Sequence, residues 1–459
     1  MSNLKFLPAG TAKTEKNFLF AVRTFDGDYD SALYLNEKQL NFFAQRPGNK
    51  ITLQIGSKKA TVRIKKQTFD TREKILYLSK DVFEHFPFSF DIPLLLSFSN
   101  KKIICLGPSI GITIKDKTLS TVKSDSALVK RALLAKKYGI LFYCFALEQV
   151  NWQQNIVRAF QLNHDDTKWL EVLVPVPQVI YDMGSYPKPQ TVKSFAKKGN
   201  VTSLLWVNKT RSISKYKAYL ALNSSKQTKL LVPDTALLNK TTLEEYLEKY
   251  SFCYIKPDFG RNGRYVYRLQ KSKKGYLCKA GGSKVKSLLF PHAKILFSFI
   301  KKHKRNFIIQ QGITLSRLAI FPFDLRVLMQ KNSTQDWLLS AVNFRIAQPG
   351  AIVTNFAQGA NDELVLPGEK LPYPGLTWDE LNRFCLNVIL VIDKFFGPLG
   401  EIGLDVALDH NGKLWLLEVN TRPSSTAYRN ADAATCEKIF GTPLKYAISL
   451  IRRKLDENF

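Results

Sequence analysis

The most constraining feature of this 459-residue chain is the segment EIGLDVALDHNGKLWLLEVNTRPSS at 401–425. Two apolar runs flank an Asn-Gly pair at 411–412, and this pair is a strong signal for a tight turn between antiparallel strands. Successive side chains of a strand alternate between the two faces of a sheet, so Glu418 and Asn420 share one face. Pairing of the two strands can bring Asp405 to that face as well. The segment therefore predicts a hairpin that presents two carboxylates and an amide at one point.

These three side chains are candidate metal ligands. Hard oxygen donors suit Mg²⁺, which takes few protein ligands and completes its shell with phosphate oxygens and water. Asp405, Glu418 and Asn420 are therefore expected to hold Mg²⁺, with Mn²⁺ as an alternative ion. Ion pairs could satisfy the two carboxylates instead, because an unpaired carboxylate is disfavoured among apolar neighbours. The hairpin by itself leaves both interpretations open.

A second segment, FCYIKPDFGRNGRYVYRL at 252–269, combines a lysine with a glycine-bearing loop. Lys256 ends a predicted strand, Gly260 and Gly263 lie in the loop, and another strand leaves from Arg264. Glycines let the backbone approach a phosphate closely, and amides in such a turn can bind an anion. The segment is neither a Walker A loop nor a G-x-G-x-x-G motif. A glycine turn near a lysine is common, so this segment alone is a weak indication of a phosphate site.

Two arginines stand on predicted strands where apolar residues would otherwise pack. Arg326 lies in FDLRVLMQ, and Arg345 begins the run that continues as RIAQPGAIVTNFAQGA. Guanidinium groups suit phosphate and carboxylate partners. Asn355, in the second run, could assist at a transferring phosphoryl group. Ordinary surface arginines on strands are the alternative interpretation of this pattern.

Hydrophobic patterns divide the chain into three predicted domains. Residues 1–120 are β-rich, with a strand spacing that suggests a barrel or a sandwich. Residues 121–205 alternate helix and strand, which predicts a small α/β layer with a single strand across residues 171–183. Residues 206–459 predict a larger α/β domain that continues to the end.

Three helices are predicted within the last domain. The segment KYKAYLALN at 215–223 predicts a short helix, and TTLEEYLEKY at 241–250 predicts a second with Thr241 or Thr242 as its N-cap. TWDELNRFCLNVILVIDKFF at 377–396 predicts a long amphipathic helix capped by its first threonine.

Charge is the strongest compositional signal. The chain has 68 Lys and Arg against 38 Asp and Glu, for a net charge of +30. Such an excess favours a polyanionic partner, and a generally basic surface is the alternative. No helix-turn-helix, zinc-finger or aromatic RNA-binding signature accompanies the charge, so no specific nucleic acid is expected.

Cysteine spacing and hydropathy indicate the compartment. The six cysteines form no C-x-x-C pair, which predicts reduced and mostly buried thiols. The N-terminal segment lacks the apolar region of a secretion signal, and no apolar run approaches the ~20 residues that span a bilayer. We therefore expect a cytoplasmic protein without a membrane span.

The order of these segments resembles the ATP-grasp superfamily: KP-x-x-G, IIQQGI, DLRVL, NFRIA, TNFAQGA, EIGLDVALD and WLLEVNTRPS. Upstream, LGPSIGI, YCFALEQVNW, VPVPQVIYDM and LVPDT resemble more narrowly the YheC/YheD family of endospore coat-associated proteins. The resemblance covers most of the chain from about residue 103. It implies an ATP-grasp fold, in which two α+β subdomains hold ATP between their sheets. A small α/β layer and the N-terminal β-rich domain would precede that fold.

The resemblance also implies where the nucleotide would lie. Lys256 and the Gly260–Gly263 loop would contact the phosphates, and Lys215 or Lys217 would be a further ATP lysine. The hinge would be formed by residues 310–313, whose backbone groups would face adenine. Its members are Gln310, Gln311, Gly312 and Ile313.

The implied chemistry is an ATP-dependent ligation of a carboxylate to an amine through an acyl phosphate. Arg326, Arg345 and Asn355 would face the γ-phosphate or the acyl phosphate. In view of the net charge, the acid is expected to be polyanionic. Spore-coat proteins are expected partners, and the spore coat or mother-cell cytoplasm is an expected location. The alternative is a non-catalytic coat-associated protein that binds nucleotide or an acidic polymer.

The chain departs from the family pattern at several positions. Gln310 and Gln311 stand where many members have an acidic residue for the ribose hydroxyls. The GRNGR loop is more basic than the Gly/Ser-rich loops of relatives. Gln178 and Met183 stand where an acid and a basic residue are usual. These differences concern the ribose contact and the site of the second substrate.

Overall fold

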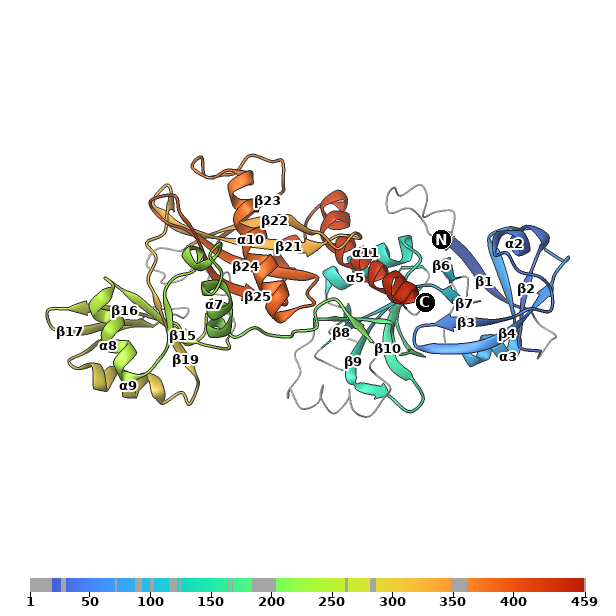
Figure 1. Ribbon diagram of the computed structural model, residues 1–459, viewed down its shortest axis with the longest axis horizontal. Helices are drawn as coiled ribbons and strands as arrows, with labels where there is room; N and C mark the ends of the chain where they lie inside the picture. The colour runs from blue at the N-terminus through green and yellow to red at the C-terminus, as the bar shows by residue number, and fades with distance from the viewer. Residues whose placement is uncertain are drawn as a thin grey trace. The chain divides into compact units, whose positions relative to one another are not determined.

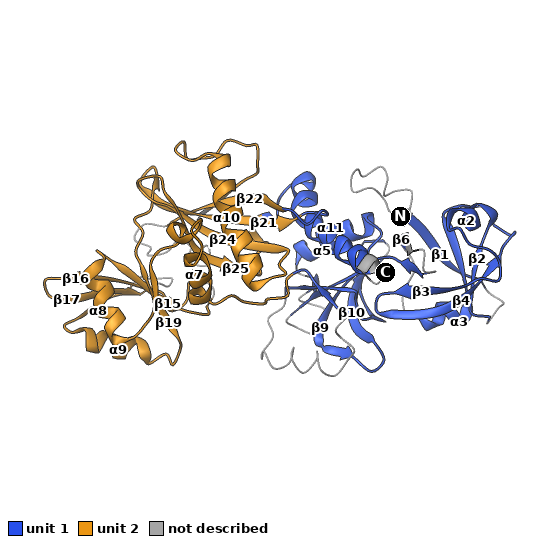
Figure 2. Cartoon of the chain, viewed as in Figure 1, with its two compact units in different colours: residues 1–207, 332–336, 428–459 blue, residues 208–331, 337–427 orange. Residues whose placement is uncertain are grey.

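The structure is a computed structural model, and it describes the chain except for residues 1–18, 26–29, 71, 87–92, 100–102, 115–121, 124, 164, 167, 184–203, 261–262, 281–285, 348–360 and 458–459. The described residues form two compact units (Figure 2). Unit 1 comprises residues 1–207, 332–336 and 428–459, and unit 2 comprises residues 208–331 and 337–427. Asn355 falls outside the described residues.

Unit 1 begins with a closed barrel whose strand order is β1-β5-β2-β4-β3-β7-β6 (Figure 1). Its elements are β1 (Leu19–Phe25), β2 (Ala32–Leu35), α2 (Glu37–Phe42), β3 (Lys50–Ile55), β4 (Lys58–Lys66), β5 (Ile75–Ser79), α3 (Lys80–His85), β6 (Leu94–Ser99) and β7 (Ile103–Leu106). Strand alternation builds the interior: Val62 and Ile64 of β4 are buried, whereas Arg63 between them is exposed. The β-rich prediction is confirmed, and of the two predicted forms the barrel is correct.

Unit 1 also contains a six-stranded mixed sheet in the order β11-β10-β9-β8-β12-β13, with α5 and α11 packed together beside it. Its elements are β8 (Ser109–Thr113), α5 (Ser126–Lys137), β9 (Leu141–Asn151), β10 (Ile156–Leu162), β11 (Trp169–Pro175), β12 (Val179–Asp182), β13 (Leu205–Trp206) and α11 (Ala433–Glu457). The predicted α/β layer is confirmed. The single strand expected across residues 171–183 is two strands, because Pro175 and Pro177 interrupt backbone pairing between them.

The smaller sheet of unit 2 is antiparallel, in the order β14-β19-β15-β16-β17-β18. Its elements are β14 (Thr235–Leu237), α8 (Lys240–Lys249), β15 (Cys253–Pro257), β16 (Tyr267–Ser272), β17 (Gly275–Ala280), β18 (Lys286–Phe290), α9 (Ala293–Lys301) and β19 (Phe307–Gln311). Residues of both helices share a core with Ile255 and Ile309 of the sheet. The predicted N-cap of α8 is wrong: Asn239 caps the helix, because its side chain accepts from the backbone N–H of Thr242 while the Thr242 hydroxyl accepts from Asn239.

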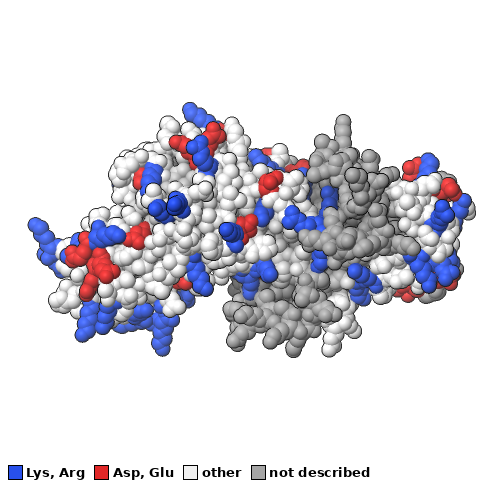
Figure 3. Space-filling model, in the orientation of Figure 1, with Lys and Arg blue, Asp and Glu red and all other residues white. Residues whose placement is uncertain are grey.

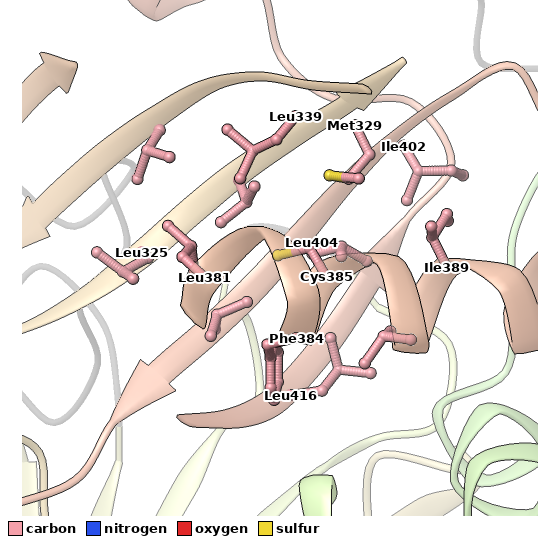
Figure 4. Close-up of a cluster of buried hydrophobic side chains, with 14 of the residues drawn as sticks. Leu325, Met329, Leu339, Leu381, Phe384, Cys385, Ile389, Ile402, Leu404 and Leu416 are labelled. Carbon is pink, nitrogen blue, oxygen red and sulfur yellow. The ribbon is translucent and has the colours of Figure 1, made fainter. Parts of the chain in front are cut away.

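The larger sheet of unit 2 has the order β23-β22-β21-β24-β25, with β20 paired to β21. Its elements are α7 (Lys215–Asn223), β20 (Arg317–Leu318), β21 (Phe321–Lys331), β22 (Trp337–Ile346), β23 (Asn361–Val365), α10 (Trp378–Phe396), β24 (Glu401–Leu408) and β25 (Leu414–Asn420). Thr377 caps α10 in a capping box with Glu380, as predicted. Figure 4 shows Leu381, Cys385 and Ile389 of α10 packed against β-strand side chains such as Leu404. This apolar layer covers one face of the sheet and leaves the other face for polar side chains.

All six cysteines are free and buried, as the sequence predicted. Within the described part of the chain, the structure contains no helix whose length and apolar character would suffice to cross a bilayer. Basic side chains gather over α9 in the view of Figure 3, and exposed Lys294, Lys301 and Lys302 belong to this helix and its C-cap. The basic excess of the sequence is therefore concentrated in part on one helix of unit 2.

Candidate functional site

The candidate site lies on the face of the larger sheet that is turned away from α10. Strand alternation puts Leu325, Phe344 and Leu404 into the core, and their neighbours along each strand point the other way. This polar face carries Asp324, Arg326, Asn343, Arg345, Asp405, Glu418 and Asn420. The register sets Arg326 opposite both Asp405 and Asn343, and Asp405 opposite Glu418. The predicted arginines and predicted metal ligands are thus brought to one surface.

Two arginines and two aspartates form a partly buried ion-pair network on this face. Nε and Nη2 of Arg345 lie 2.7 and 2.6 Å from the two carboxylate oxygens of Asp324, and Nη2 lies 3.3 Å from Oδ2 of Asp405. Arg326 donates to both oxygens of Asp405 through Nε and Nη2. Burial raises the pKa of Asp405, but Arg326 and Arg345 outweigh burial and hold that pKa below its ordinary value. Asp405 is therefore ionised and fixed between two cations.

Gly403 provides the room for Arg326. A Cβ at this position would lie 3.2 Å from Cδ of Arg326 and 3.4 Å from its Nη1. The glycine of the EIGLD motif therefore lets the long arginine side chain lie flat across β24 toward Asp405.

Two lysines contact β25, the strand that carries Glu418. Nζ of Lys215 lies 3.1 Å from Oε1 of Glu418, and Nζ of Lys256 donates to the carbonyl oxygen of Leu417 at 3.1 Å. Burial lowers the pKa of Lys256 to about 8; Glu418 and Asp405 oppose this shift, while Lys215 adds to it. Lys217 is exposed. Of the two lysines that the sequence proposed, the structure brings Lys215 to the site.

Asp258 holds the two lysines beside each other. Its Oδ1 accepts from the Ser214 hydroxyl at 2.8 Å and from the Tyr216 backbone N–H at 2.9 Å, and its carbonyl accepts from the Lys215 N–H at 3.2 Å. Asp258 follows Lys256 by two residues, so these bonds join the end of β15 to the start of α7. The sequence reasoning missed Asp258, although it stands inside the quoted KPDFG segment.

A small pocket lies beside these lysines, with Lys215 in its wall. Its walls come from α7, β19 and β25, with apolar side chains such as Ala218, Leu222 and Leu416 and polar ones such as Lys215 and Gln310. The hinge predicted at residues 310–313 begins with the last two residues of β19. Gly312 is required there by close packing, because a Cβ would lie 2.2 Å from the ring of Phe252. Ile313 is buried at the end of this segment.

The glycine loop is described only at its two ends. Gly260 packs against Pro257, and Gly263 adopts a left-handed backbone with φ of 64°. Such a conformation favours glycine because it has no Cβ. Residues 261–262 between them lie outside the described residues, as does Asn355. A phosphate contact by this loop and a catalytic contact by Asn355 stay predictions.

The three predicted metal ligands are neighbours. Nδ2 of Asn420 donates to Oδ1 of Asp405 at 3.4 Å, and Glu418 faces Asp405 across the hairpin. The described residues contain no group of three or more His, Cys, Asp and Glu placed to hold a metal ion; this set has two acids and one amide. Its hard oxygens fit Mg²⁺ in type and number. Each carboxylate also has a cationic partner, so a divalent ion would compete with Arg326 and Lys215.

Sequence reasoning missed two further polar residues of this face. Asp324 is 3% exposed and pairs with Arg345, and its signal was its place two residues before Arg326 on the same strand face. Asn343 is 4% exposed, and within the described part of the chain its Oδ1 has no hydrogen-bond partner. The sequence feature that could have indicated Asn343 is its position two residues before Arg345 on the same strand face.

We expect Asp324→Asn to destabilise the fold by about 3 kcal/mol, because removing one partner of a buried ion pair leaves a buried charge short of compensation. Glu248→Gln is the control: Glu248 pairs with Lys271, and their side chains are 65% and 50% exposed, so this change should cost at most about 0.5 kcal/mol. Urea denaturation followed by tryptophan fluorescence measures both. If both variants lost equally little stability, Asp405 alone would be sufficient to compensate the charge of Arg345.

Lys256 should make stability depend on pH. Its pKa is about 8 in the folded chain, below the ~10.4 of an unfolded chain, so between these values the unfolded state binds more protons. Stability therefore rises with pH across this window, and below about pH 8 the burial penalty is complete. Relative to Lys256→Met, the wild type should gain stability between about pH 7 and about pH 9.5, measured by urea denaturation. The control is Lys217→Met, because Lys217 is exposed. Relative to this variant, the wild type should gain no stability over the same pH range. A gain of equal size would contradict the assignment of the effect to Lys256.

Comparison with known proteins identifies the family of the part of the chain that carries this site. Residues 203–450 match the model of a family described as YheC/D like ATP-grasp. Endospore coat-associated protein YheD of Bacillus subtilis (strain 168) is 26% identical over 344 residues, which cover 70% of this chain and 74% of that protein. YheC of the same organism, also named an endospore coat-associated protein, is 24% identical over 346 residues, covering 73% and 94%.

The solved structures that resemble this chain are more distant relatives. The structure of D-cycloserine synthetase DcsG aligns with a TM-score of 0.46 at 12% identity, over 75% of this chain and 99% of that chain. A likeness of this degree says nothing about a substrate. The family match, in contrast, spans more than half of the 459 residues. This chain therefore belongs to the YheC/D-like ATP-grasp family.

Proposed function

We propose that this protein binds ATP in unit 2 and uses it to join a carboxylate to an amine. The observation that carries the proposal is the gathering of Lys215, Arg326 and Arg345 against Asp405 and Glu418 on one sheet face. Cations for phosphate and hard oxygens for a divalent ion are there in direct contact. A site of this composition suits a polyphosphate bound together with a metal ion.

The nucleotide would occupy the pocket beside the two lysines. Lys215 and Lys256 would contact phosphate oxygens, and the Gly260–Gly263 loop would approach them with its backbone. The apolar walls contributed by α7 and β25 suit a purine ring. The hinge at residues 310–313 would face the base with Gln310, Gln311 and Ile313.

Asp405, Glu418 and Asn420 would hold Mg²⁺, which would neutralise phosphate charge when bound. Arg326, Arg345 and Asn355 would face the transferring phosphoryl group and stabilise its negative charge. The carboxylate oxygen of the acid would attack the γ-phosphorus and release ADP. The amine would then attack the acyl carbon and release phosphate. The protein's contribution is to position the reactants and to stabilise charge.

The acid is proposed to be anionic beyond its reacting group, because the net charge of +30 exceeds what one triphosphate requires. The exposed lysines of α9 are a place where such a chain could be held. The names of YheD and YheC favour a second candidate function for this protein. It would be a coat-associated protein that binds nucleotide or an acidic polymer without turnover. Its location would be the spore coat or the mother-cell cytoplasm. Release of ADP separates the two candidates.

Mg²⁺ and ATP together should raise the melting temperature, because ligand at about 100 times its Kd stabilises the folded state by ~2.7 kcal/mol. Lys256→Met should remove most of this increase, because the Lys256 ammonium would contact a phosphate oxygen in the proposed complex. Lys217→Met is the matched control, since exposed Lys217 is the neighbouring lysine that the structure does not bring to the site. Thermal denaturation with and without nucleotide measures all three proteins. An unchanged ATP response in Lys256→Met would exclude Lys256 from the site.

Glu418→Gln should abolish Mg²⁺-dependent ADP release, because it keeps the shape of the side chain and removes one charged oxygen donor. The assay supplies ATP, Mg²⁺ and a small-molecule cell extract as the source of acid and amine, and Glu248→Gln serves as the exposed control. If Glu418 were only the partner of Lys215, the variant would lose stability and retain its Mg²⁺ response; circular dichroism of the same sample detects this. If ATP stabilises the wild-type protein but no ADP is released, the result would favour the second candidate function, binding without turnover.

A further inference from the structure

β18 forms an open edge of the smaller sheet. It is the last strand in the order β14-β19-β15-β16-β17-β18 and pairs with β17 on one side. Among the described residues no strand pairs with its other side. Residues 286–289 are exposed one after another. The edge of a sheet presents a row of backbone N–H and C=O groups that can pair with another extended chain. β18 therefore offers backbone hydrogen bonds to a partner.

Two exposed leucines flank this edge on opposite faces of the sheet. Leu288 is 38% exposed and lies opposite Cys278, which belongs to the core shared with α8 and α9. It is therefore on the helix-covered face. Leu289 is 51% exposed and lies opposite Leu277 on the other face, because neighbouring side chains of a strand alternate. A strand added beside β18 could pack its own side chains against both leucines.

The surroundings of β18 are basic on both faces. Residues 259–323 contain fifteen Lys and Arg and no Asp or Glu, a charge of +15 out of the +30 of the whole chain. Lys279 of β17 lies on the face of Leu289. Lys286 is exposed and alternates with its neighbours so that it lies on the face of Leu288. Charge of one sign around an interaction surface selects a partner of the opposite sign, so the edge suits an acidic partner.

Two other occupants fit this edge less well. A second copy of the chain, paired through β18, would bring two equally basic edges together, and like charges repel across paired strands. A lipid bilayer would leave the backbone groups of the edge without hydrogen-bond partners in hydrocarbon. An extended acidic chain satisfies the backbone groups, covers the leucines and neutralises the lysines.

We propose that β18 binds an acidic polypeptide in an extended conformation, which adds to the edge of the smaller sheet as a further strand. The backbone of the partner would form hydrogen bonds with the open side of β18. Its acidic side chains would lie near Lys279 and Lys286, and its apolar side chains beside Leu288 and Leu289. The inference rests on the proposed function in that it names the class of the anionic partner proposed there, but binding at this edge requires no ATP.

The test measures binding of a fluorescein-labelled peptide of four Glu-Val repeats to the whole chain by fluorescence anisotropy, without nucleotide. The peptide is acidic, and its valines favour an extended conformation. Wild-type protein should bind it. Lys286→Glu should weaken binding by about 10-fold at low salt, because an attraction becomes a repulsion. Lys370→Glu is the matched control: Lys370 is exposed between β23 and α10, the net charge changes equally, and binding should stay within about twofold of wild type.

Two further peptides test the mode of binding. Methylation of the backbone nitrogens of two adjacent central residues retains the charge and blocks both edges of the peptide, because successive N–H groups of a strand point to opposite sides. This peptide should bind about 10-fold more weakly than the unmodified one. A peptide of four Lys-Val repeats has the same length and the opposite charge, and it should not bind.

The outcomes separate this inference from the proposed function. Equal affinity of wild type and Lys286→Glu would overturn the assignment to this edge, and equal affinity for the methylated peptide would overturn strand addition. Sedimentation with phosphatidylglycerol vesicles, in the absence of any peptide binding, would overturn the proposal in favour of a membrane. Peptide binding by a protein that ATP does not stabilise would overturn the proposed function alone. Release of ADP by a protein that binds no acidic peptide would overturn this inference alone.

Discussion

The buried contact between Arg345 and the carboxylates of Asp324 and Asp405 is the interaction on which the candidate site depends. Charges that leave water must be paired, because desolvation penalises each ion by several kcal/mol. The larger sheet of unit 2 meets this requirement through register, since β21, β22 and β24 place opposite charges at facing positions. The apolar face of the same strands packs against α10 and holds that register. Packing on one side of the sheet thereby positions the charges on the other side.

The lysines reach this face by a different route. Lys256 comes from the smaller sheet and Lys215 from the start of α7, and Asp258 joins these two elements through hydrogen bonds to Ser214 and to backbone amides. Lys215 then pairs with Glu418, a proposed metal ligand, and Lys256 bonds to the carbonyl of the preceding residue. The proposed function requires these partners to exchange, with the carboxylates turning to the ion and the cations to the phosphates. A site that is neutral within itself can make this exchange without exposing an uncompensated charge.

Much of the fold and part of the site could be predicted because the patterns are local. The Asn-Gly turn, strand alternation and the Thr377 cap depend on neighbours in sequence, and the structure confirms the hairpin and α10. Local patterns were less informative where alternatives compete within a few residues. Asn239 caps α8 in place of Thr241 or Thr242, and two prolines divide the strand expected at residues 171–183. Asp324 and Asp258 were overlooked because an aspartate beside a recognised arginine or lysine has no pattern of its own.

The sequence by itself determined that Glu418 and Asn420 share one strand face and that two arginines lie on strands of the same domain; it also indicated that pairing of the hairpin can bring Asp405 to that face. It also determined the family, through the order of its motifs. Only the tertiary structure decided that Arg326 and Arg345 meet Asp405, and that Lys215 and not Lys217 meets Glu418. These contacts join residues from different strands and helices. Their existence depends on sheet register and packing across long sequence separations, which no local pattern encodes.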